Sequence, residues 1–274
     1  MNQPLVTAIV LNFRSPRDTA ACAEMLRRQT IAKQTEILVV DNCSADESVG
    51  FLRNRFRSAK DIRIVETSKN LGYGRGNDYA IASARGTFIM VINPDNGLEP
   101  DGLERMVAAM DADPGIGILA PQLVQEDGSI RDSFRSFPTL LDIVIKRTRL
   151  RRFFPERMER YTHHASSHQT VQDVDWIAGA CFLMRRSLYD QLGGFDPRFF
   201  LFFEDTDLCR RCWEAGKRVV YYPTIHATDR RRRLSDGGFM ALFTKKTARI
   251  HLISAFKYFW KWRGRGLPGR CSAA

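Results

Sequence analysis

Short apolar runs rich in β-branched residues alternate with helical segments through the first hundred residues of the chain. The four runs are VTAIVLN (6–12), EILVVDN (36–42), IRIVET (62–67) and TFIMVIN (87–93). Nearly continuous apolar strands with helices between them are typical of a parallel sheet that helices cover on both faces. The pattern therefore predicts an α/β fold built on a doubly wound, mainly parallel sheet.

Polar side chains stand where three of these runs end. Asn12 closes the first run, Asp41 lies at the end of the second, and Asp95 follows the fourth in the sequence VINPDN. In sheets of this kind, ligands bind outside the carboxyl ends of the strands. Pro94 fixes the backbone that aims Asp95, although Asn-Pro-Asp-Asn is also a favoured composition for a plain turn. We therefore expect the three polar groups to meet at one edge of the sheet.

The segment KNLGYGRGND (69–78) is rich in glycine and precedes a helical stretch. Its spacing is not that of a dinucleotide-binding fingerprint, and it follows the third run where that fingerprint follows the first, which disfavours a dehydrogenase. Glycines allow close backbone approach, and Arg75 would meet an anion near the start of the helix. The segment is predicted to be either a phosphate or sugar cradle or a flexible turn.

A second pair of acids follows five apolar residues in FFLFFED, which ends in Glu204 and Asp205. The next residues, TDLCRRCWEAG (206–216), have the periodicity of a helix that stops at Gly216. Acids at a helix start complement its dipole, and that explanation suffices for Asp207. Partial burial at the rim of an apolar core raises the pKa of a carboxyl toward the range of a general base. Asp205 is therefore the candidate for chemistry.

The cysteine and histidine residues do not form a strong metal motif. The six cysteines lack the spacing of a disulfide framework, so reduced thiols are expected. Cys209-x-x-Cys212 has no second pair at zinc-finger spacing, and helical phase places Cys212 in the core. The stretch HHASSH (163–168) is polar and is predicted to be a solvated loop. His226 ends a strand-like run and becomes a credible ligand if Asp95 holds a metal beside it.

Taken together and in this order, these segments resemble a family 2 glycosyltransferase with a Rossmann-like GT-A fold. The resemblance covers roughly residues 5 to 230. The segments that carry it are TAIVLN, VVDNCSADES, NLGYGRGND, FIMVINPDN, DWIAGACFLMRR and GGFDPRFFLFFEDTDLCRR, with a later histidine. The Asn-Pro-Asp and Phe-Phe-Glu-Asp variants most resemble bacterial rhamnosyltransferases, which build cell-surface polysaccharides from dTDP-L-rhamnose. The resemblance implies an enzyme that uses a nucleotide-sugar donor.

The resemblance also implies roles on the donor side. It implies that Asp41 binds the pyrimidine base of the donor and that Asp95 holds a divalent metal, Mg²⁺ or Mn²⁺, which bridges the diphosphate. It implies His226 as a second protein ligand of that metal. The residues implied to touch the nucleotide or pyrophosphate are Asn12, Arg75 and Asn77. Many relatives carry Asp-x-Asp, whereas position 93 here is Asn, so metal binding rests chiefly on Asp95.

On the acceptor side, the resemblance implies that Asp205 is the catalytic base and that Trp176 and Glu204 line the acceptor. An inverting transfer needs a base on one face of the sugar and a cation that stabilises the leaving nucleoside diphosphate on the other, and the two acid sites fit that division. The Gln-x-x-Arg-Trp signature of processive relatives is absent. We therefore expect an inverting, metal-dependent, non-processive glycosyltransferase that adds one sugar at a time.

The positive charge of the chain is concentrated toward its C-terminal end. From Arg230 onward there are 12 Lys and Arg residues and one acid, which accounts for the whole formal net charge of +11. We therefore predict a catalytic domain over 1–229, with a nucleotide-sugar half (about 1–98) and an acceptor half (about 99–229), and a basic tail over 230–274.

The basic tail is predicted to contain an amphipathic helix within residues 239–266. Its predicted apolar face consists of Leu252, Ile253, Phe256, Phe259 and Trp260, while Lys246, Lys257 and Lys261 lie away from that face. Such a helix binds a membrane interface, or it packs its aromatic face on the catalytic body. An acceptor carried on a polyprenyl diphosphate would explain a membrane location, because its lipid lies in the bilayer.

Three alternative functions stay open on the sequence. A UDP-hexose would replace the dTDP-sugar as the donor. A nucleotidyltransferase that makes nucleotide sugars would share the sheet and the metal acid, but it would carry a basic, glycine-rich loop where this chain has NFRSPRD. A nucleic-acid-binding protein fits the sequence pI of 9.7. Acids at a ligand edge repel phosphate backbones, so no nucleic-acid partner is expected.

The sequence contains no predicted membrane-spanning or secretory segment. No stretch reaches the roughly 18 uninterrupted apolar residues of a spanning helix, and the early run LVTAIVL lacks a small-residue cleavage site. We therefore expect a cytoplasmic protein that is held peripherally on the inner face of the cell membrane.

Overall fold

The computed structural model describes residues 3–162, 168–230 and 246–268. The strands of its main sheet are β1 (Val6–Asn12), β2 (Thr35–Asp41), β3 (Ile62–Glu66), β4 (Phe88–Ile92), β5 (Asn96–Leu98), β6 (Ile116–Gln125), β8 (Gln172–Asp173), β10 (Cys181–Arg185) and β11 (Arg218–Asp229). A separate two-stranded sheet consists of β7 (Phe134–Arg135) and β9 (Trp176–Ile177). The predicted loop HHASSH lies outside the described residues except for His168.

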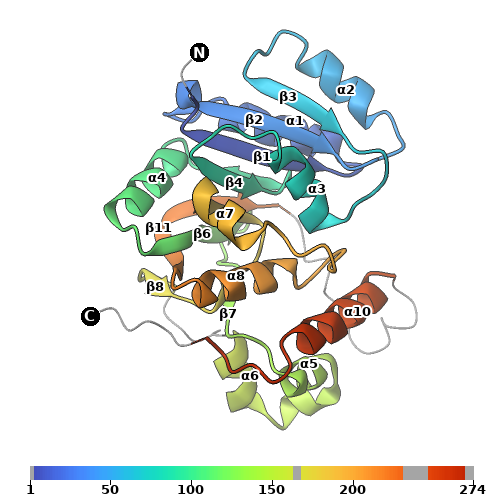
Figure 1. Ribbon diagram of the computed structural model, residues 1–274, viewed down its shortest axis with the longest axis vertical. Coiled ribbons are helices and arrows are strands. Elements are labelled where there is room, and N and C mark those ends of the chain that lie inside the picture. Colours follow the sequence, from blue (N-terminus) through green and yellow to red (C-terminus); the bar gives the residue numbers. More distant parts are fainter. Residues whose placement is uncertain (1–2, 163–167, 231–245, 269–274) are drawn as a thin grey trace.

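Helices cover both faces of the main sheet (Figure 1). The helices of the described residues are α1 (Pro16–Leu26), α2 (Ser48–Arg55), α3 (Tyr73–Ile81), α4 (Gly102–Ala112), α5 (Leu140–Arg147), α6 (Pro155–Thr162), α7 (Arg186–Leu192), α8 (Glu204–Glu214) and α10 (Lys246–Lys261), with two 3₁₀ turns, η1 (Ala32–Gln34) and η2 (Arg149–Arg152); α5, α6 and α10 lie together at one end of the molecule, away from these faces. The order of strands across the sheet is β3-β2-β1-β4-β10-β6-β11-β5, and β8 pairs with β11. The predicted α/β architecture is confirmed.

The first four strands form a wholly parallel block. β1 pairs in parallel with β2 and with β4, and β2 pairs in parallel with β3. All seven residues of β2 and all five of β4 are buried, which explains why these strands appear in the sequence as continuous apolar runs. The predicted strands agree with the observed ones to within one residue at each end.

The second half of the sheet is mixed. β10 lies between β4 and β6 and runs antiparallel to both, whereas β11 pairs in parallel with β6. Because β10 runs against β4, the residues that lead into β10 lie at the carboxyl end of β4. This reversal places residues 178–180 at the edge where the predicted ligand site lies.

Two apolar clusters lie on the two faces of the sheet. Alternate residues of β1 point to opposite faces, as the pleat requires. Val6, Ala8 and Val10 pack in one cluster with α1 and α4, while Ile9 packs in the other with α3, α7 and α8. The helix that carries the second pair of acids, α8, is therefore fixed on the core by its apolar side.

A third apolar cluster joins α10 to the body. Its members are Ile143, Phe199, Phe203, Ala255, Tyr258 and Trp262. Lys261 adds two ion pairs, since its Nζ lies 2.7 Å from Asp196 and 2.6 Å from Asp207, and the indole of Trp262 donates to Asp207 at 3.0 Å. Of the two alternatives that the sequence leaves open for this helix, the structure shows packing on the catalytic body.

The face of α10 that packs is not the predicted one. Of the five residues expected on the apolar face, only Phe259 packs against the third cluster, while Leu252, Ile253, Phe256 and Trp260 are 40–67% exposed. Apolar residues occur on more than one face of this helix. Periodicity alone therefore does not identify the face that packs on the body. In the part of the chain that the structure describes, no helix is both long enough and apolar enough to span a membrane.

Candidate active site

Asn12 and Asp41 end neighbouring parallel strands, β1 and β2, in direct register. The side-chain amide of Asn12 donates to Oδ1 of Asp41 at 2.6 Å. Ser44 donates to the same oxygen through its hydroxyl (2.6 Å) and to Oδ2 through its backbone amide (3.0 Å). Asn12 and Asp41 are both buried. The predicted convergence of these strand ends is confirmed, and the Asp41 carboxylate is held in one orientation.

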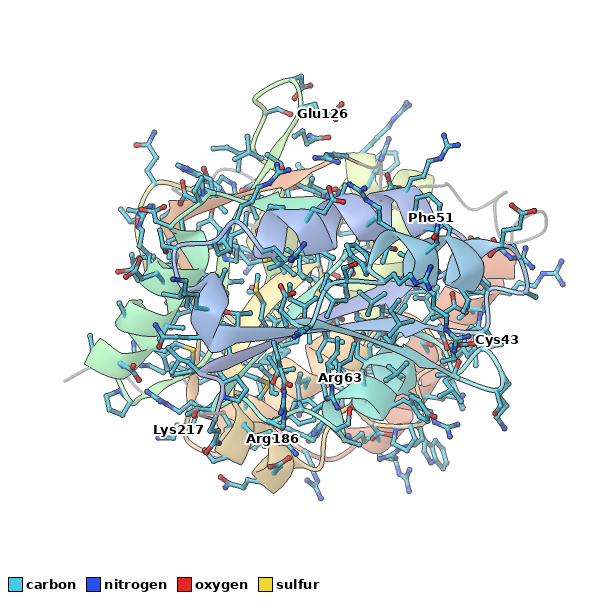
Figure 2. The ribbon with its side chains drawn as sticks, turned by 90° about the horizontal axis from the view of Figure 1, so that it is seen from above. Cys43, Phe51, Arg63, Glu126, Arg186 and Lys217 are labelled. Carbon is cyan, nitrogen blue, oxygen red and sulfur yellow. The ribbon has the colours of Figure 1, made fainter. Side chains whose placement is uncertain are left out.

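The backbone around Asp41 is strained. Arg14, Cys43 and Ala45 have φ values of 57°, 56° and 55°, a region that residues other than glycine rarely adopt. Arg14 is held there by a hydrogen bond from its amide to the Ser44 hydroxyl at 3.0 Å, and Cys43 lies partly exposed beside this edge (Figure 2). Strain of this kind clusters at ligand-binding sites, which favours this edge as a binding site.

Asp95 lies in a tight turn at the carboxyl end of β4. The amide of Asn96 donates to the carbonyl of Asn93 at 3.0 Å, which closes the turn around Pro94 and Asp95. The amide of Asn93 donates to the carbonyl of Ala180 at 2.8 Å, so the turn is attached to the segment that leads into β10. The turn that the sequence offered as one alternative is therefore present at this position, and the ligand-facing role of Asp95 stays a prediction.

Glu204 and Asp205 begin α8. The amide of Gly179 donates to Oδ2 of Asp205 at 3.0 Å, and the amide of Thr206 donates to Oδ1 at 2.7 Å. Glu204 is buried, and its Oε2 has no hydrogen-bond partner in the described structure. The two adjacent acids thus have different surroundings, because donors stabilise the charge of only one of them.

The surroundings of the two acids set their order of ionisation. Burial raises the pKa of Glu204 well above its ordinary value, and the neighbouring charge of Asp205 raises it further. Burial also raises the pKa of Asp205, but the hydrogen bonds from Gly179 and Thr206 oppose that rise. Two adjacent carboxylates do not both ionise readily in a buried site. Asp205 is therefore the member of the pair that ionises first.

The backbone just before the pair is also strained. Phe202 and Phe203 have φ values of 70° and 69°. The loop is held by a 2.8 Å hydrogen bond from the Tyr73 amide to the Phe200 carbonyl, and the ring of Phe203 is buried in the third cluster. Because several contacts fix this conformation, the direction in which Glu204 and Asp205 leave the helix start is determined by the fold.

A two-residue bridge connects the acid pair to the turn that carries Asp95. Gly179 donates its amide to Asp205, and the next residue, Ala180, accepts the amide of Asn93. The hydroxyl of Tyr73 donates to the carbonyl of Gly179. The pKa of Tyr73 is raised by burial first, and then by the charges of Glu204, Asp205 and Asp95 among others. Asp95 and Asp205 therefore meet at one edge of the sheet.

The glycine-rich segment has a packing explanation. A Cβ on Gly72 would lie 2.0 Å from the carbonyl oxygen of Phe200, and one on Gly76 would lie 2.4 Å from a methyl group of Leu11. A Cβ on Gly74 would meet the side chain of a buried phenylalanine at 2.9 Å. The glycines thus allow other parts of the protein to approach closely, and α3 begins within the segment at Tyr73.

The remaining predicted residues have different settings. Arg75 is exposed at the start of α3. Asn77 is fully buried, donates to the carbonyl of Tyr73 at 2.9 Å, and has an Oδ1 without a partner in the described structure. Trp176, on β9, is partly buried and donates its indole N–H to the carbonyl of Ser136 at 2.8 Å.

His226 lies beside Glu99, not beside Asp95. The amide of His226 donates to Glu99 at 3.0 Å, and its ring Nδ1 lies 3.7 Å from the same carboxylate. β11 continues beyond His226 to Asp229, and the amide of Arg230 reaches the carbonyl of Asp95 at 3.2 Å. Four residues of extended backbone span about 13 Å, so the structure does not bring His226 and Asp95 together on one cation.

The cysteines do not provide a metal centre in the described residues. Cys22, Cys43, Cys181, Cys209 and Cys212 are free, as predicted. Burial raises the pKa of Cys212 to about 12 and that of Cys209 well above its ordinary value, so both thiols stay protonated. No group of three or more His, Cys, Asp or Glu side chains suited to a metal occurs among the described residues.

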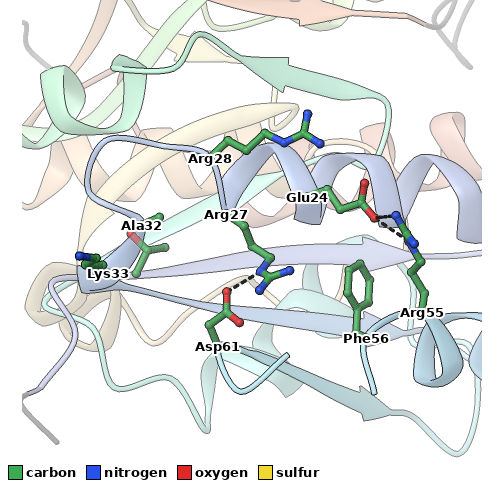
Figure 3. Close-up of a pocket in the computed structure, with 9 residues that line it drawn as sticks. Glu24, Arg27, Arg28, Ala32, Lys33, Arg55, Phe56 and Asp61 are labelled. Atoms are coloured by element: carbon green, nitrogen blue, oxygen red, sulfur yellow. Dashed lines mark hydrogen bonds and ion pairs between the residues drawn. The ribbon is translucent and has the colours of Figure 1, made fainter. Parts of the chain in front are cut away.

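A surface pocket of about 650 Å³ lies at the opposite edge of the sheet (Figure 3). It is lined by residues that include Thr35, at the amino end of β2. Two of its arginines already have acidic partners: Arg27 lies 2.7 Å from Asp61, and Arg55 pairs with Glu24. This pocket is separate from the edge where the predicted site residues meet.

The family assignment agrees with this geometry. The model of the family described as glycosyl transferase family 2 matches residues 7–193, more than half of the chain. The chain belongs to this family. The match includes Asn12, Asp41, Asp95 and Trp176 but ends before Glu204.

Two curated relatives are rhamnosyltransferases. An N-acetylglucosaminyl-diphospho-decaprenol L-rhamnosyltransferase of Mycobacterium tuberculosis is 29% identical over 204 residues, which cover 70% of this chain and 65% of that relative. Rhamnosyltransferase WbbL of Escherichia coli is 28% identical over 200 residues, which cover 70% of this chain and 71% of that protein. The chain thus spans less than two thirds of the length of the mycobacterial relative.

Solved structures support the GT-A fold. GalNAc-T7 with UDP, GalNAc and Mn²⁺ has a TM-score of 0.64 at 14% identity, with 85% of this chain and 45% of that chain covered. Mannosyltransferase PcManGT of Pyrobaculum calidifontis in complex with GDP-Man and Mn²⁺ has a TM-score of 0.59 at 16% identity, with 98% and 78% covered. At these identities the likeness establishes the fold.

The structure adds two residues that the sequence did not single out. Tyr73 and Gly179 connect the acid pair to the turn of Asp95 at the carboxyl edge of the sheet. In the sequence, Tyr73 is one letter of the glycine-rich segment and Gly179 belongs to a stretch of small residues. Neither position has a periodicity or spacing that distinguishes it, because its partners are distant in the chain.

Proposed function

We propose that this protein is an inverting, non-processive glycosyltransferase that transfers L-rhamnose from dTDP-L-rhamnose to a glycan on a polyprenyl diphosphate. The similarity to two rhamnosyltransferases, one of them named for a diphospho-decaprenol substrate, supports the choice of donor and acceptor. A dTDP- or UDP-sugar donor and a bacterial cell-surface glycan product follow from the same similarity.

The observation that carries the proposal is the bridge between Asp205 and the turn of Asp95. Asp205, charged and held by the amide of Gly179, takes the proton of the acceptor hydroxyl. The hydroxyl oxygen then attacks the anomeric carbon, and the nucleoside diphosphate leaves from the opposite face toward the donor edge. A single displacement by the acceptor oxygen, with no covalent intermediate on the protein, inverts the configuration at that carbon.

Asp95 is proposed to hold the divalent cation, Mg²⁺ or Mn²⁺. A single carboxylate suits such a site, because Mg²⁺ is commonly bound by one or two carboxylates with the remaining positions filled by substrate phosphates and water. When bound, the cation would stabilise the negative charge of the departing diphosphate. His226 is not included, since it lies beside Glu99.

The other site residues divide between donor and acceptor. Asp41, oriented by Asn12, is proposed to accept a hydrogen bond from the pyrimidine base, and Arg75 to meet the pyrophosphate. Asn77 is buried and is proposed to position this loop through the carbonyl of Tyr73. Two residues on the other side, Trp176 and Glu204, are proposed to line the acceptor. Protonated Glu204 donates a hydrogen bond there without competing for the proton that Asp205 takes.

The test is a panel of dTDP-, UDP- and GDP-sugars with Mg²⁺ or Mn²⁺, in which release of the nucleoside diphosphate is measured. Asp205→Asn is expected to lower turnover by roughly 10²- to 10⁴-fold, the usual contribution of a general base, while donor binding persists. Asp190→Asn, at an exposed acid of α7 that pairs with Arg186, is the matched control. Equal turnover by Asp205→Asn and wild type would remove the proposed base.

The panel also separates the alternatives. Release of nucleoside diphosphate only from UDP-hexoses would replace rhamnose as the transferred sugar and leave the roles of the acids intact. Release of pyrophosphate from a nucleoside triphosphate and a sugar phosphate would indicate a nucleotidyltransferase instead.

A further inference from the structure

The segment 140–154 exposes an unusual amount of apolar surface. It consists of α5, η2 and the two phenylalanines that precede α6. Six of its side chains are 42–76% exposed: Leu140, Leu141, Val144, Leu150, Phe153 and Phe154. Scattered exposed apolar residues are normal, but a contiguous exposed apolar patch marks an interaction site. This segment is distant in sequence from the C-terminal tail and was not part of the predicted membrane contact.

The same segment is strongly basic. In the sequence it contains five Lys and Arg residues and one acid, Asp142. That acid is used internally, because it closes the capping box of α5 with Thr139 and accepts a hydrogen bond from Arg157 at 2.7 Å. Arg151 and Arg152 are exposed next to the apolar side chains. The surface is therefore apolar and cationic at once.

The outer face of α10 has the same character. Leu252, Ile253, Phe256 and Trp260 are exposed there. The rings of Phe256 and Trp260 stack with centroids 6.1 Å apart. The guanidinium of Arg263 lies over the Trp260 ring at 3.9 Å, so a cation accompanies the largest aromatic side chain of this face.

The two elements lie side by side. Ile143 of α5 belongs to the same buried cluster as Ala255 and Tyr258 of α10. Figure 1 shows α5, α6 and α10 together at one end of the molecule, away from β3 and α2. Segment 140–154 and α10 therefore pack against each other, and we call their exposed sides together the apolar-cationic surface.

We propose that the apolar-cationic surface binds an anionic phospholipid bilayer, with segment 140–154 as a second membrane contact beside α10. Aromatic and aliphatic side chains with interspersed Arg and Lys suit the boundary between headgroups and acyl chains, and each basic residue near an anionic surface adds about 1 kcal/mol of attraction. A symmetric contact between two copies would instead bring two patches of the same positive charge together, so charge favours the bilayer over a second copy.

The proposed bilayer contact adjoins the acid pair. Phe203, which packs against α10, immediately precedes Glu204 and Asp205 in the chain, and Phe199 of the same cluster lies four residues before Phe203. If the acceptor is lipid-linked, which rests on the proposed function, the same surface holds the enzyme where that lipid resides. Binding to the bilayer itself requires neither donor nor acceptor, so it is measured independently of the reaction.

The test is flotation of the full chain with vesicles of phosphatidylcholine alone and of phosphatidylcholine mixed with phosphatidylglycerol. Phe153→Ser with Phe154→Ser in one variant, and Phe256→Ser with Trp260→Ser in another, are each expected to weaken binding to the anionic vesicles by roughly tenfold or more, because each removes two interfacial aromatic side chains. Phe51→Ser is the matched control: Phe51 is similarly exposed but lies on α2 (Figure 2), and its change is expected to leave binding unaltered.

A charge variant tests the contribution of the basic residues to bilayer binding. Arg151→Glu with Arg152→Glu is expected to weaken binding to the anionic vesicles by at least about tenfold and to reduce its salt dependence. Arg57→Glu, at an exposed arginine near α2, is its control. Thermal unfolding of each variant should match wild type, since all the changed side chains are exposed.

Three outcomes would overturn the proposal. The first is undiminished flotation of the Phe153/Phe154 variant, which would leave α10 as the sole contact. The second is equal binding to neutral and anionic vesicles. The third is no flotation, combined with a dimer in light scattering that the same variants abolish, which would assign the surface to a second copy. Sugar transfer to a water-soluble acceptor is measured in parallel. It tests the proposed function without a bilayer, so a failure of the membrane proposal can be told apart from a failure of the proposed function.

Discussion

The amide nitrogen of Gly179 lies 3.0 Å from Oδ2 of Asp205. The carbonyl of the same glycine accepts the hydroxyl of Tyr73, and the carbonyl of the next residue accepts the amide of Asn93. One short segment thus holds the proposed base, a partly buried tyrosine and the turn of Asp95 in fixed relation. Because all three contacts involve the backbone of residues 179–180, a change in one of them is transmitted to the others.

The hydroxyl of Tyr73 is expected to be needed for this arrangement. Tyr73→Phe leaves the carbonyl of Gly179 without its side-chain donor, and an unsatisfied buried acceptor costs about 1–3 kcal/mol. We expect a loss of stability in that range, measured by urea unfolding, and a lower kcat because Gly179 orients Asp205. Tyr79→Phe, at an exposed tyrosine of the same helix, should change neither quantity. Unaltered kcat and stability in Tyr73→Phe would contradict the role of the bridge.

The two adjacent acids are expected to respond differently to amide substitution. Burial raises the pKa of Glu204 well above its ordinary value, and glutamine mimics a neutral acid, so Glu204→Gln should retain most of its turnover at neutral pH. Asp205→Asn should lose at least about a hundredfold, as expected for a general base. The measurement is nucleoside diphosphate release by both variants at one pH. The reverse ranking would assign the base to Glu204.

The pH dependence of turnover follows from the raised pKa of Asp205. A base is active when ionised, so kcat/KM should fall as pH falls through that pKa, and burial places this fall above the ordinary range of an aspartate. In a profile at saturating metal, the acidic limb should persist in Glu204→Gln. A flat profile down to pH values near the ordinary pKa of aspartate would contradict the burial of the base.

The titration of Glu204 should make the folded protein less stable as pH rises, whereas turnover should fall as pH falls. The pKa of Glu204 is higher in the folded than in the unfolded protein, so the folded state binds more protons and stability falls as pH rises from the unfolded value toward the folded one. Glu204→Gln removes this titration and should raise the melting temperature relative to wild type at neutral and alkaline pH, with little difference in acid. A melting temperature lowered equally at every pH would contradict a buried, protonated Glu204.

The parallel half of the fold could be predicted because its strands are buried on both faces. β2 and β4 appear in the sequence as unbroken apolar runs, and the polar residues after them, Asp41 and Asp95, necessarily lie at the carboxyl ends. The meeting of Asp205 with this edge could not be derived in the same way. It depends on β10 running antiparallel between β4 and β6, and no local pattern specifies the direction of a strand.

Contacts between residues that are distant in sequence explain the other differences between the predictions and the structure. The sequence places His226 at a strand end, but pairing with β5 extends β11 to Asp229. Periodicity selects one apolar face of α10, whereas Phe199 and Phe203 of the body select the face that packs. The exposure of Phe153 likewise depends on what the fold leaves uncovered, which hydropathy alone does not reveal.

Lys261 is expected to be the main electrostatic attachment of α10. Its ammonium lies between Asp196 and the fully buried Asp207, and removing one partner of a buried ion pair typically costs about 3–5 kcal/mol. We expect a loss toward the lower end of that range for Lys261→Ala, because Trp262 and Arg211 still contact Asp207. Urea unfolding at neutral pH measures the effect.

The control for Lys261 lies one turn earlier in the same helix. Lys257 donates to the carbonyl of Arg198 at the surface, so Lys257→Ala should cost less than about 1 kcal/mol, as for other exposed polar contacts. Burial opposes ionisation of Asp196, but hydrogen bonds from Arg198 and Lys261 hold its pKa below the usual range. The stability that this acid contributes is therefore present at neutral pH and lost as pH falls through the folded pKa. Equal losses in Lys257→Ala and Lys261→Ala would contradict the attachment.

Gly72 is expected to be irreplaceable, and Gly50 offers a matched comparison. Gly72 has φ of 83°, and a Cβ there would lie 2.0 Å from the carbonyl oxygen of Phe200, so Gly72→Ala must displace the loop that precedes Glu204. A strained backbone and a main-chain clash together should cost at least about 2 kcal/mol. Gly50 lies inside α2, and a Cβ added there would have no atom within 4 Å, so Gly50→Ala should stabilise the protein by about 0.5–1 kcal/mol. Calorimetry of both variants shows whether stability falls in Gly72→Ala and rises in Gly50→Ala. Because the displaced loop orients Asp205, turnover should fall only in Gly72→Ala.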